Sequence, residues 1–457
     1  MRGIFVIAHR WVGLFIAVFL FVAGLTGAVI SWDHELDGWL NPELFTAKQT
    51  GKPLPPLELV AKFEAAHPEA QVIYFPLSYE AGETAEMFIT PRIDPATGEP
   101  YALEYNQVYV EPVSGDVVGK RYWGRISLSR ADLLPFLYKL HYSMHVPDFF
   151  NFDRWGVWLM GIVGIVWMFD CFVGFYLTLP SLARNGGQAV LAMPSSRARA
   201  GATFWERWKP AWRIKRGAST YRLNLDLHRA FGLWFWLLLF ILAFTSVSMN
   251  LGTEVVRPLL ATVSTLTPDV DDTRTPAPLN KPIKADQPFA HVIDEARNEA
   301  QRRDWKEPLG SAFYDPQIGV YQVSFFQPGD EHGSGGMGVK TLYFDGKNGA
   351  LLGDHVPWKG TAADVFMQLQ FPLHSGRIAG VPGRIALTIL GLVVALLSIT
   401  GVVIWFKKRH ARLSARILNG KSTPVMPTPT PRLLEVTQLG VKHLILAATK
   451  AGRGRDL

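Results

Sequence analysis

The chain has 457 residues, a formal net charge of +7 and a single cysteine, Cys171. One cysteine excludes a disulfide framework, and it also excludes thiolate zinc sites, iron–sulfur clusters and covalently attached c-type haem, which need at least two. The apolar residues are concentrated in a few long runs, which is typical of a membrane protein.

Four apolar runs are long enough to cross a bilayer, which needs roughly 20 residues. They cover about 11–32, 155–179, 229–250 and 385–406. The first run is too long for the apolar part of a signal peptide and lacks a small-residue cleavage site. We therefore expect four transmembrane helices.

Basic residues are unevenly distributed between the segments that connect these runs. Residues 181–227 carry nine Lys/Arg against two acids, and 407–457 carry eleven against two. Residues 33–140 and 251–373 carry sixteen acids each, against nine and eleven basic residues. Because basic segments stay in the cytoplasm, we expect both termini inside and two large domains outside. The net positive charge is explained by this topology and by contact with anionic membrane lipid, and it does not indicate nucleic-acid binding.

Two pairs of segments in the chain repeat each other. The first and third apolar runs share identical residues at one constant spacing: His9/His228, Arg10/Arg229, Gly13/Gly232, Phe21/Phe240 and Thr26/Thr245. A Leu-His dipeptide precedes each of the other two runs, at Leu140-His141 and Leu373-His374. The chain thus reads as span–domain–span twice over, and duplicated membrane proteins build their sites between the halves.

Four histidines mark the ends of the four expected helices and suit a group held inside the bundle. The topology puts His9 and His228 at the cytoplasmic ends, and His141 and His374 at the outer ends. Each pair shares a depth, as two axial imidazoles on one haem iron require. We predict two non-covalent haem b groups with bis-histidine ligation, one near each surface. The alternative is four interfacial histidines, but their recurrence in pairs at matched depth favours ligation.

The outer pair has a second candidate ligand. His145 follows His141 by one helical turn, so both could lie on one face. The shared Leu-His context of His141 and His374 favours His141, while His145 could be the ligand instead or contact a substrate.

Charged residues near these histidines are candidates for supporting roles. Arg10 and Arg229 inside, and Arg377 and Arg384 outside, could bind haem propionates, because a guanidinium presents a fixed fork of donors to carboxylates. For the inner two, ordinary snorkelling at the membrane surface is an equal alternative. Asp170 is an acid deep in an apolar run, where a carboxylate is costly. It could carry protons or pair with Arg10 or Arg229, or it could be a tolerated, protonated residue.

Each outer segment is too long for a connector and is predicted to fold as a small α+β domain. Helical patterns at 57–63 and near 287–301 are followed by strand-like segments at 71–75, 86–90, 107–111, 318–326 and 341–345. Residues 108–119 and 342–353 align with each other as strand, glycine turn, strand. Glycine-rich 333–338 lacks the flanking strand and helix of a dinucleotide loop. We interpret 328–338 as a loop that shapes a ligand pocket.

The expected fold is a membrane α-helical bundle of four transmembrane helices in duplicated halves, with two α+β domains outside. Its expected parts are a transmembrane helix at 1–32, an outer domain at 33–138, a second helix at 139–180, a basic cytoplasmic loop at 181–224, a third helix at 225–250, a second outer domain at 251–372, a fourth helix at 373–408 and a basic cytoplasmic tail at 409–457.

The strand–turn–strand phrase at 108–119 resembles the PepSY domain, and the spans with His-Arg and Leu-His openings resemble the PepSY-associated transmembrane helix family, up to about residue 410. Within that family the architecture resembles the FoxB-type di-haem ferrisiderophore reductases of the bacterial inner membrane. The resemblance implies two periplasmic PepSY-like domains and a reductase that passes electrons across the inner membrane to an Fe(III)-siderophore, releasing Fe(II). No flavin or nicotinamide domain is recognisable, so the electrons would come from quinol or from a separate cytoplasmic reductase.

Two alternatives stay open at this point. PepSY domains are also associated with protease inhibition, so the chain could be a haem-free membrane protein that regulates proteases or signalling. The other alternative keeps the haems and changes the acceptor to another metal or a small oxidant.

Overall fold

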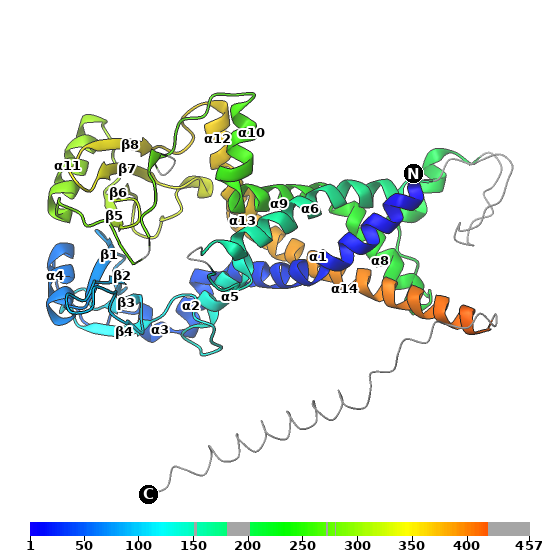
Figure 1. Ribbon diagram of the computed structural model, residues 1–457, viewed down its shortest axis with the longest axis horizontal. Helices are drawn as coiled ribbons and strands as arrows, with labels where there is room; N and C mark the ends of the chain where they lie inside the picture. The colour runs from blue at the N-terminus through cyan, green and yellow to red at the C-terminus, as the bar shows by residue number, and fades with distance from the viewer. Residues whose placement is uncertain (150–152, 181–201, 271–272, 279, 419–457) are drawn as a thin grey trace, which may run out of the picture. The chain divides into compact units, whose positions relative to one another are not determined.

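The structure is a computed structural model that describes residues 1–457 except 150–152, 181–201, 271–272, 279 and 419–457 (Figure 1). Contacts divide the chain into two units, 1–403 and 404–457. The described part of the second unit is the end of helix α14 (Gly380–Leu418). Much of the expected basic loop and most of the basic tail therefore lie outside the described residues.

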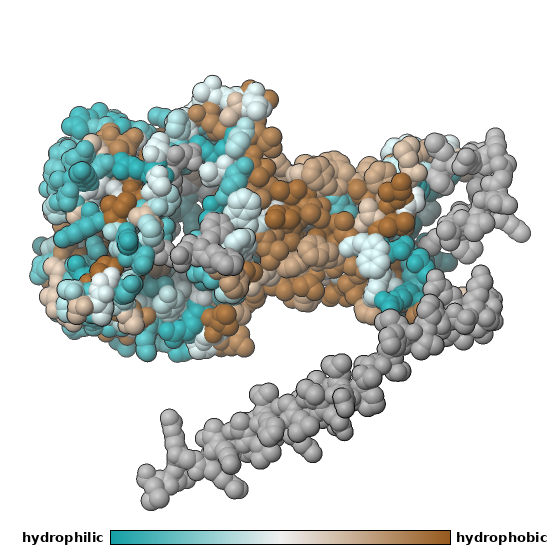
Figure 2. Space-filling model, in the orientation of Figure 1, coloured by the Kyte–Doolittle hydropathy of each residue, from teal (hydrophilic) through white to brown (hydrophobic). Residues whose placement is uncertain are grey.

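Three helices are long and apolar enough to cross a membrane: α1 (Arg2–Ile30), α6 (Trp155–Thr178) and α14. A fourth crossing would need α8 (Thr220–Trp234) and α9 (Trp236–Asn250) together, and these two meet at a bend of 71°. The prediction of one continuous helix over 225–250 is therefore wrong in its geometry. Figure 2 shows hydrophobic side chains gathered on the helices and hydrophilic side chains over the strands.

Helices α1 and α14 contact each other through glycine. A Cβ atom built on Gly24 would lie 2.6 Å from the carbonyl oxygen of Gly391, and one built on Gly391 would lie 2.6 Å from that of Gly24. Small residues let helix backbones approach this closely, which is how transmembrane helices pack without a hydrophobic driving force between them.

Two of the candidate histidines lie on short helices rather than on the spans themselves. His141 is on α5 (Leu133–Ser143) and His374 is on α13 (Gln370–Ser375). Each short helix ends at a residue in the left-handed conformation, Met144 with φ 52° and Gly376 with φ 73°. The expectation that these histidines sit on the spanning helices is thus wrong, because the chain turns between each histidine and its span.

Eight antiparallel strands form a single sheet with the order β4-β3-β2-β1-β5-β6-β7-β8. The strands are β1 (Ala70–Pro76), β2 (Ala85–Pro91), β3 (Gln107–Val110), β4 (Val117–Arg121), β5 (Leu309–Asp315), β6 (Val320–Phe325), β7 (Lys340–Asp345) and β8 (Leu351–His355). Strands from the two outer segments meet at β1 and β5, where Tyr74 pairs with Phe313. The two expected α+β units are therefore joined edge to edge, a pairing that the sequence did not indicate.

The aligned segments 108–119 and 342–353 form strand–turn–strand units as predicted. They contain the β3–β4 and β7–β8 pairs, and Gly115 and Gly349 occupy the turns with φ 74° and 72°. A positive φ suits glycine, which has no Cβ to clash.

Helices α4 (Pro56–Ala66) and α11 (Phe289–Arg302) pack on the sheet and form its core with apolar strand residues. Phe289 packs against both core clusters, next to Phe75 of β1 and Tyr321 of β6. A buried ion pair of 2.7 Å between Arg121 and Asp37 ties β4 to α2 (Asp33–Leu40), which follows α1. The remaining helices are α3 (Pro42–Phe45), α7 (Phe204–Trp208), α10 (Arg257–Ala261) and α12 (Ala362–Gln368).

The glycine contact predicts a position-specific loss of stability. Gly24→Val would force the α1 and α14 backbones apart and is expected to lower the free energy of unfolding in detergent by about 1–3 kcal/mol. Gly13→Val is the matched control on the same helix, because a Cβ there meets nothing within 4 Å. Denaturant titration followed by tryptophan fluorescence measures both, and equal losses would contradict the close approach.

Candidate functional site

The imidazole rings of His141 and His374 lie close together, although α5 and α13 are far apart in the chain. Their ring centroids are 6.1 Å apart, with 62° between the planes. We call this pair, which lies on the short helices α5 and α13, the second pair.

Each ring of the second pair is held through its Nδ1 atom. That of His141 lies 3.0 Å from the carbonyl oxygen of Ala23 and 3.1 Å from the hydroxyl of Thr26, and that of His374 lies 3.0 Å from the hydroxyl of Thr245. Both threonine hydroxyls donate to carbonyls of their own helices, so they accept from the rings. Both Nδ1 atoms therefore carry the hydrogen, and Nε2 presents the lone pair.

The first pair is His9 on α1 and His228 on α8, with ring centroids 6.2 Å apart and 59° between the planes. The Nδ1 atom of His9 lies 2.9 Å and 3.0 Å from the two carboxylate oxygens of Asp170 on α6. The Nδ1 atom of His228 lies 3.0 Å from the hydroxyl of Thr400 and 3.2 Å from the carbonyl oxygen of Leu397, both on α14. These contacts again assign the hydrogen to Nδ1.

Glycine residues make room for three of the four rings. A Cβ atom built on Gly27 would lie 2.9 Å from Cε1 of His141. A Cβ atom built on Gly174 would lie 3.5 Å from Cε1 of His9, and one built on Gly401 would lie 3.4 Å from Cε1 of His228. A larger side chain at Gly27 would therefore displace the imidazole, and even alanine at the other two would contact it.

This geometry matches two imidazoles on one metal ion. With a metal–nitrogen distance of about 2 Å on each side, two Nε2 ligands place their ring centroids about 6 Å apart. The partner of each Nδ1 supplies the second hydrogen bond that metal-bound histidines ordinarily make. The two pairs are separated along α1, where His9 and Thr26 are seventeen residues apart, or about 25 Å at 1.5 Å per residue.

His145 takes a different position from His141. Its ring stacks on Phe136 with 4.9 Å between centroids, and its Nε2 lies 2.9 Å from the Phe136 carbonyl oxygen. With φ 51°, His145 belongs to the turn that ends α5. The structure therefore brings His141, and not His145, to His374.

Several candidate charged residues have partners within the chain. Arg229 pairs with Asp226 at 3.0 Å and donates to the Pro210 carbonyl, whereas Asp170 contacts His9. The suggestion that Asp170 pairs with Arg10 or Arg229 is thus wrong, because both carboxylate oxygens of Asp170 lie within hydrogen-bond distance of Nδ1 of His9.

The two candidate arginines on the sheet side differ from each other. Arg384 donates to both carboxylate oxygens of Glu35, at 2.6 Å and 2.7 Å, and to the carbonyl of Ser31. Arg377 reaches Asp33 only at 3.9 Å. Arg377 therefore has more capacity than Arg384 to bind a further anion.

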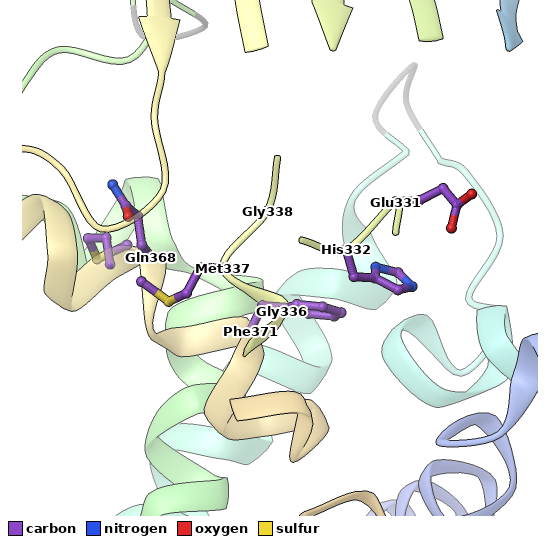
Figure 3. A pocket seen from close by; sticks show the side chains of 8 residues that line it. Glu331, His332, Gly336, Met337, Gly338, Gln368 and Phe371 are labelled. Atoms are coloured by element: carbon purple, nitrogen blue, oxygen red, sulfur yellow. The ribbon is translucent and has the colours of Figure 1, made fainter. Parts of the chain in front are cut away.

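A pocket of about 310 Å³ lies at the helices α12 and α13 (Figure 3). Its lining comes from the predicted ligand loop and from α12 and α13: Glu331, His332, Gly336, Met337, Gly338, Met367, Gln368 and Phe371. Phe371 is one helical turn before His374 on α13, so the pocket reaches the helix that carries this ligand candidate. Removal from water and the nearby Arg377 guanidinium lower the pKa of His332, which favours its uncharged form.

Sequence reasoning missed the threonines that hold three of the four rings and the residues of α12 and α13 that line the pocket. Thr26 and Thr245 were visible as part of the repeat, but their role as acceptors for His141 and His374 was not. Thr400 carried no signal, because a threonine in a transmembrane helix ordinarily bonds its own backbone.

The Glu35–Arg384 pair predicts a pH-dependent contribution to stability. Hydrogen bonds from Arg384 lower the pKa of Glu35 below its ordinary value of 4.5. Because the folded-state pKa is lowered, the ionised carboxylate stabilises the folded protein fully at pH values above the ordinary pKa of 4.5. This contribution is lost as the pH falls through the folded-state pKa. Glu35→Gln is expected to cost about 1 kcal/mol or less at neutral pH, since Glu35 is half exposed and screened.

Detergent unfolding titrations of wild type and Glu35→Gln across pH measure this contribution. The two proteins should begin to converge as the pH falls below 4.5 and should be equal below the lowered pKa of Glu35, whereas Glu58→Gln, at an exposed position on α4, should match wild type throughout. A difference that stays constant as the pH falls would argue against the ion pair.

The part of the chain that matches a known protein family includes both histidine pairs. None of the curated proteins matches the chain. Residues 6–408 match the family described as PepSY-associated TM region, a range that extends from α1 into α14. The chain belongs to the family of PepSY-associated TM regions and is a membrane protein.

Proposed function

We propose that this protein is a di-haem reductase of the bacterial inner membrane that passes electrons outward to an Fe(III)-siderophore in the periplasm. The observation that carries the proposal is the presence of two histidine pairs, with ring centroids 6.2 Å and 6.1 Å apart, near opposite ends of the helices. One pair alone would suit an isolated metal site. Two pairs about 25 Å apart along α1 suit a path across the membrane.

The residues present fit non-covalent haem b. Four imidazoles would supply bis-histidine ligation, and the single cysteine offers no attachment of the c type. When bound, haem would supply a one-electron carrier at each pair. Arg377 on the sheet side and Arg10 on the other side are the arginines proposed to hold propionates, since Arg384 and Arg229 already contact carboxylates.

The positive-inside rule supports the proposed topology, with both termini in the cytoplasm and two PepSY-like domains in the periplasm. We interpret the matching order of helix and strands in the two halves as a duplication. The second pair then lies on the periplasmic side, and the first pair faces the donor, which we propose to be quinol or a separate cytoplasmic reductase.

The pocket beside α13 is the proposed place of the acceptor. At about 310 Å³ it is at the small end of ligand pockets, which hold roughly 300–1,000 Å³, so it would receive part of a siderophore complex. Exposed Glu331 supplies a negative charge and His332 none, which favours a cationic or neutral complex. One electron converts Fe(III) to Fe(II), for which hard siderophore oxygens have a far weaker affinity, and the iron is released.

Haem content tests the ligand assignment. Purified wild type is expected to contain two haems per chain, and His9→Ala or His374→Ala one. Two substitutions within one pair should remove only one haem, so His9→Ala with His228→Ala keeps one haem. One substitution in each pair should remove both haems, so His228→Ala with His374→Ala keeps none. His145→Ala is the control and should keep both.

The pyridine haemochrome assay and the dithionite-reduced spectrum measure these contents. Colourless wild-type protein, after growth with a haem precursor, would contradict the proposal and favour the regulatory alternative. One haem in wild type would leave one pair without a ligand role.

Iron release tests the acceptor. Pre-reduced protein is expected to release Fe(II) from a cationic ferric hydroxamate complex, measured with an Fe(II) chelator, and His374→Ala to abolish the release. Glu331→Lys is expected to raise the KM for that complex several-fold with kcat retained, because it replaces attraction by repulsion. Glu58→Lys makes the same charge change on exposed α4 and should have no effect. Equal effects of the two lysines would remove the pocket from the proposal.

A further inference from the structure

We infer that Asp170 makes the first pair the site of lower reduction potential, so that electrons run from the first pair to the second. The inference rests on the proposed function and adds a physical cause for the direction of electron flow. It starts from the carboxylate of Asp170, which contacts Nδ1 of His9 through both oxygens and is one tenth exposed.

The rest of the first pair uses neutral acceptors at this position. Gly174 on α6 and Gly401 on α14 approach Cε1 of His9 and His228 at nearly the same distance, so they mark equivalent places on the two helices. Four residues before each glycine are Asp170 and Leu397. On α14 the acceptor is the backbone carbonyl of Leu397, and on α6 it is a side-chain carboxylate.

The second pair also uses neutral acceptors. His141 bonds the Ala23 carbonyl and the Thr26 hydroxyl, and His374 bonds the Thr245 hydroxyl. Within the described ranges, no carboxylate contacts either of these two rings. The two pairs therefore have the same ligand type and differ in the charge behind one ligand.

The physical effect of this difference has a definite sign. A carboxylate that accepts the Nδ1 hydrogen raises the basicity of Nε2, and its negative charge favours the more positive, oxidised state of a bound metal. Hydrogen bonds to the ligands of a haem are one of the established means of setting its reduction potential. Arg10 and Arg229 follow the ligand histidines of the first pair, and Arg377 follows His374 of the second. Because Asp226 is ion-paired with Arg229, one candidate arginine is left beside each pair, and the arginines do not by themselves separate the two sites.

The electron step that follows is balanced. With haem bound at both pairs, one electron would leave the first site, which would be oxidised, and enter the second site, which would be reduced, and no bond or proton would change place. Asp170 acts through His9 and is a positioning residue. A carboxylate inside an apolar helix is energetically costly, and the potential difference that Asp170 maintains explains why an acid occupies this position.

Spectroelectrochemical titration of the anaerobic holoprotein tests the inference. Wild type is expected to show two midpoints, and the lower one should be the midpoint that remains in His374→Ala. Asp170→Asn keeps the shape and an acceptor oxygen but removes the charge. It is expected to raise the lower midpoint potential by at least about 59 mV, which is a tenfold change in the equilibrium constant of a one-electron reduction. The upper midpoint potential should stay unchanged.

Two further variants keep the test decisive if Asp170→Asn binds haem poorly. Asp170→Glu retains the charge and should retain the low midpoint. Thr400→Asp places a carboxylate at Nδ1 of His228, and in the Asp170→Asn background it should lower the midpoint again. Thr245→Val removes the acceptor of His374 and should leave the lower midpoint unchanged.

The outcomes separate this inference from the proposed function. Haem-free wild-type protein overturns both. Two haems with midpoints that do not respond to Asp170→Asn, or a lower midpoint that disappears in His374→Ala, overturn the direction alone and leave the reductase standing.

Discussion

An N–H group on apolar helices within a membrane has no water to bind, so its acceptor must come from the chain. This constraint applies to four imidazoles here, and each meets it with a residue on a different helix: Thr26 and Ala23 for His141, Thr245 for His374, Asp170 for His9, and Thr400 with Leu397 for His228. Every such bond fixes a tautomer, a ring orientation and a contact between two helices. The packing of α1 with α5 and α6, of α9 with α13, and of α8 with α14 is therefore part of the same arrangement that presents Nε2 to a ligand.

Small residues make this arrangement possible. A threonine hydroxyl that donates to the carbonyl four residues earlier, as Thr26 does to Val22, has only acceptor capacity left for a neighbouring ring. A glycine such as Gly27 lets that ring lie against the helix backbone. Neither residue type alters the apolar character of the span, so the site costs little in membrane compatibility.

The sequence was informative where an element depends on local pattern or on repetition. The recurrence of His9 at His228 singled out one pair, and the glycines at 115 and 349 predicted tight turns that the structure has. Features that depend on distant contacts were not predictable. Strand β5 and its pairing with β1 follow from how the two outer segments meet. The bend before Trp236 has no proline, and Gly232 before it did not indicate a bend, because the matching Gly13 lies in the unbroken helix α1. The partner of Asp170 was misjudged because opposite formal charge suggested arginine, whereas a ring nitrogen on α1 lies closer.

Duplication, as we interpret the two halves, copies ligands but cannot by itself give a direction. The copied histidines His9 and His228 fall in the same pair, and so do His141 and His374, so any difference between the two sites must arise elsewhere. Changing a ligand would put binding at risk, and changing the helix crossing at Gly24 would disturb the packing. The acceptor behind one imidazole can change with the least disturbance, because the ring, the glycine beside it and the helices stay in place. Asp170 stands at that position, where one side chain is enough to make two similar sites unequal.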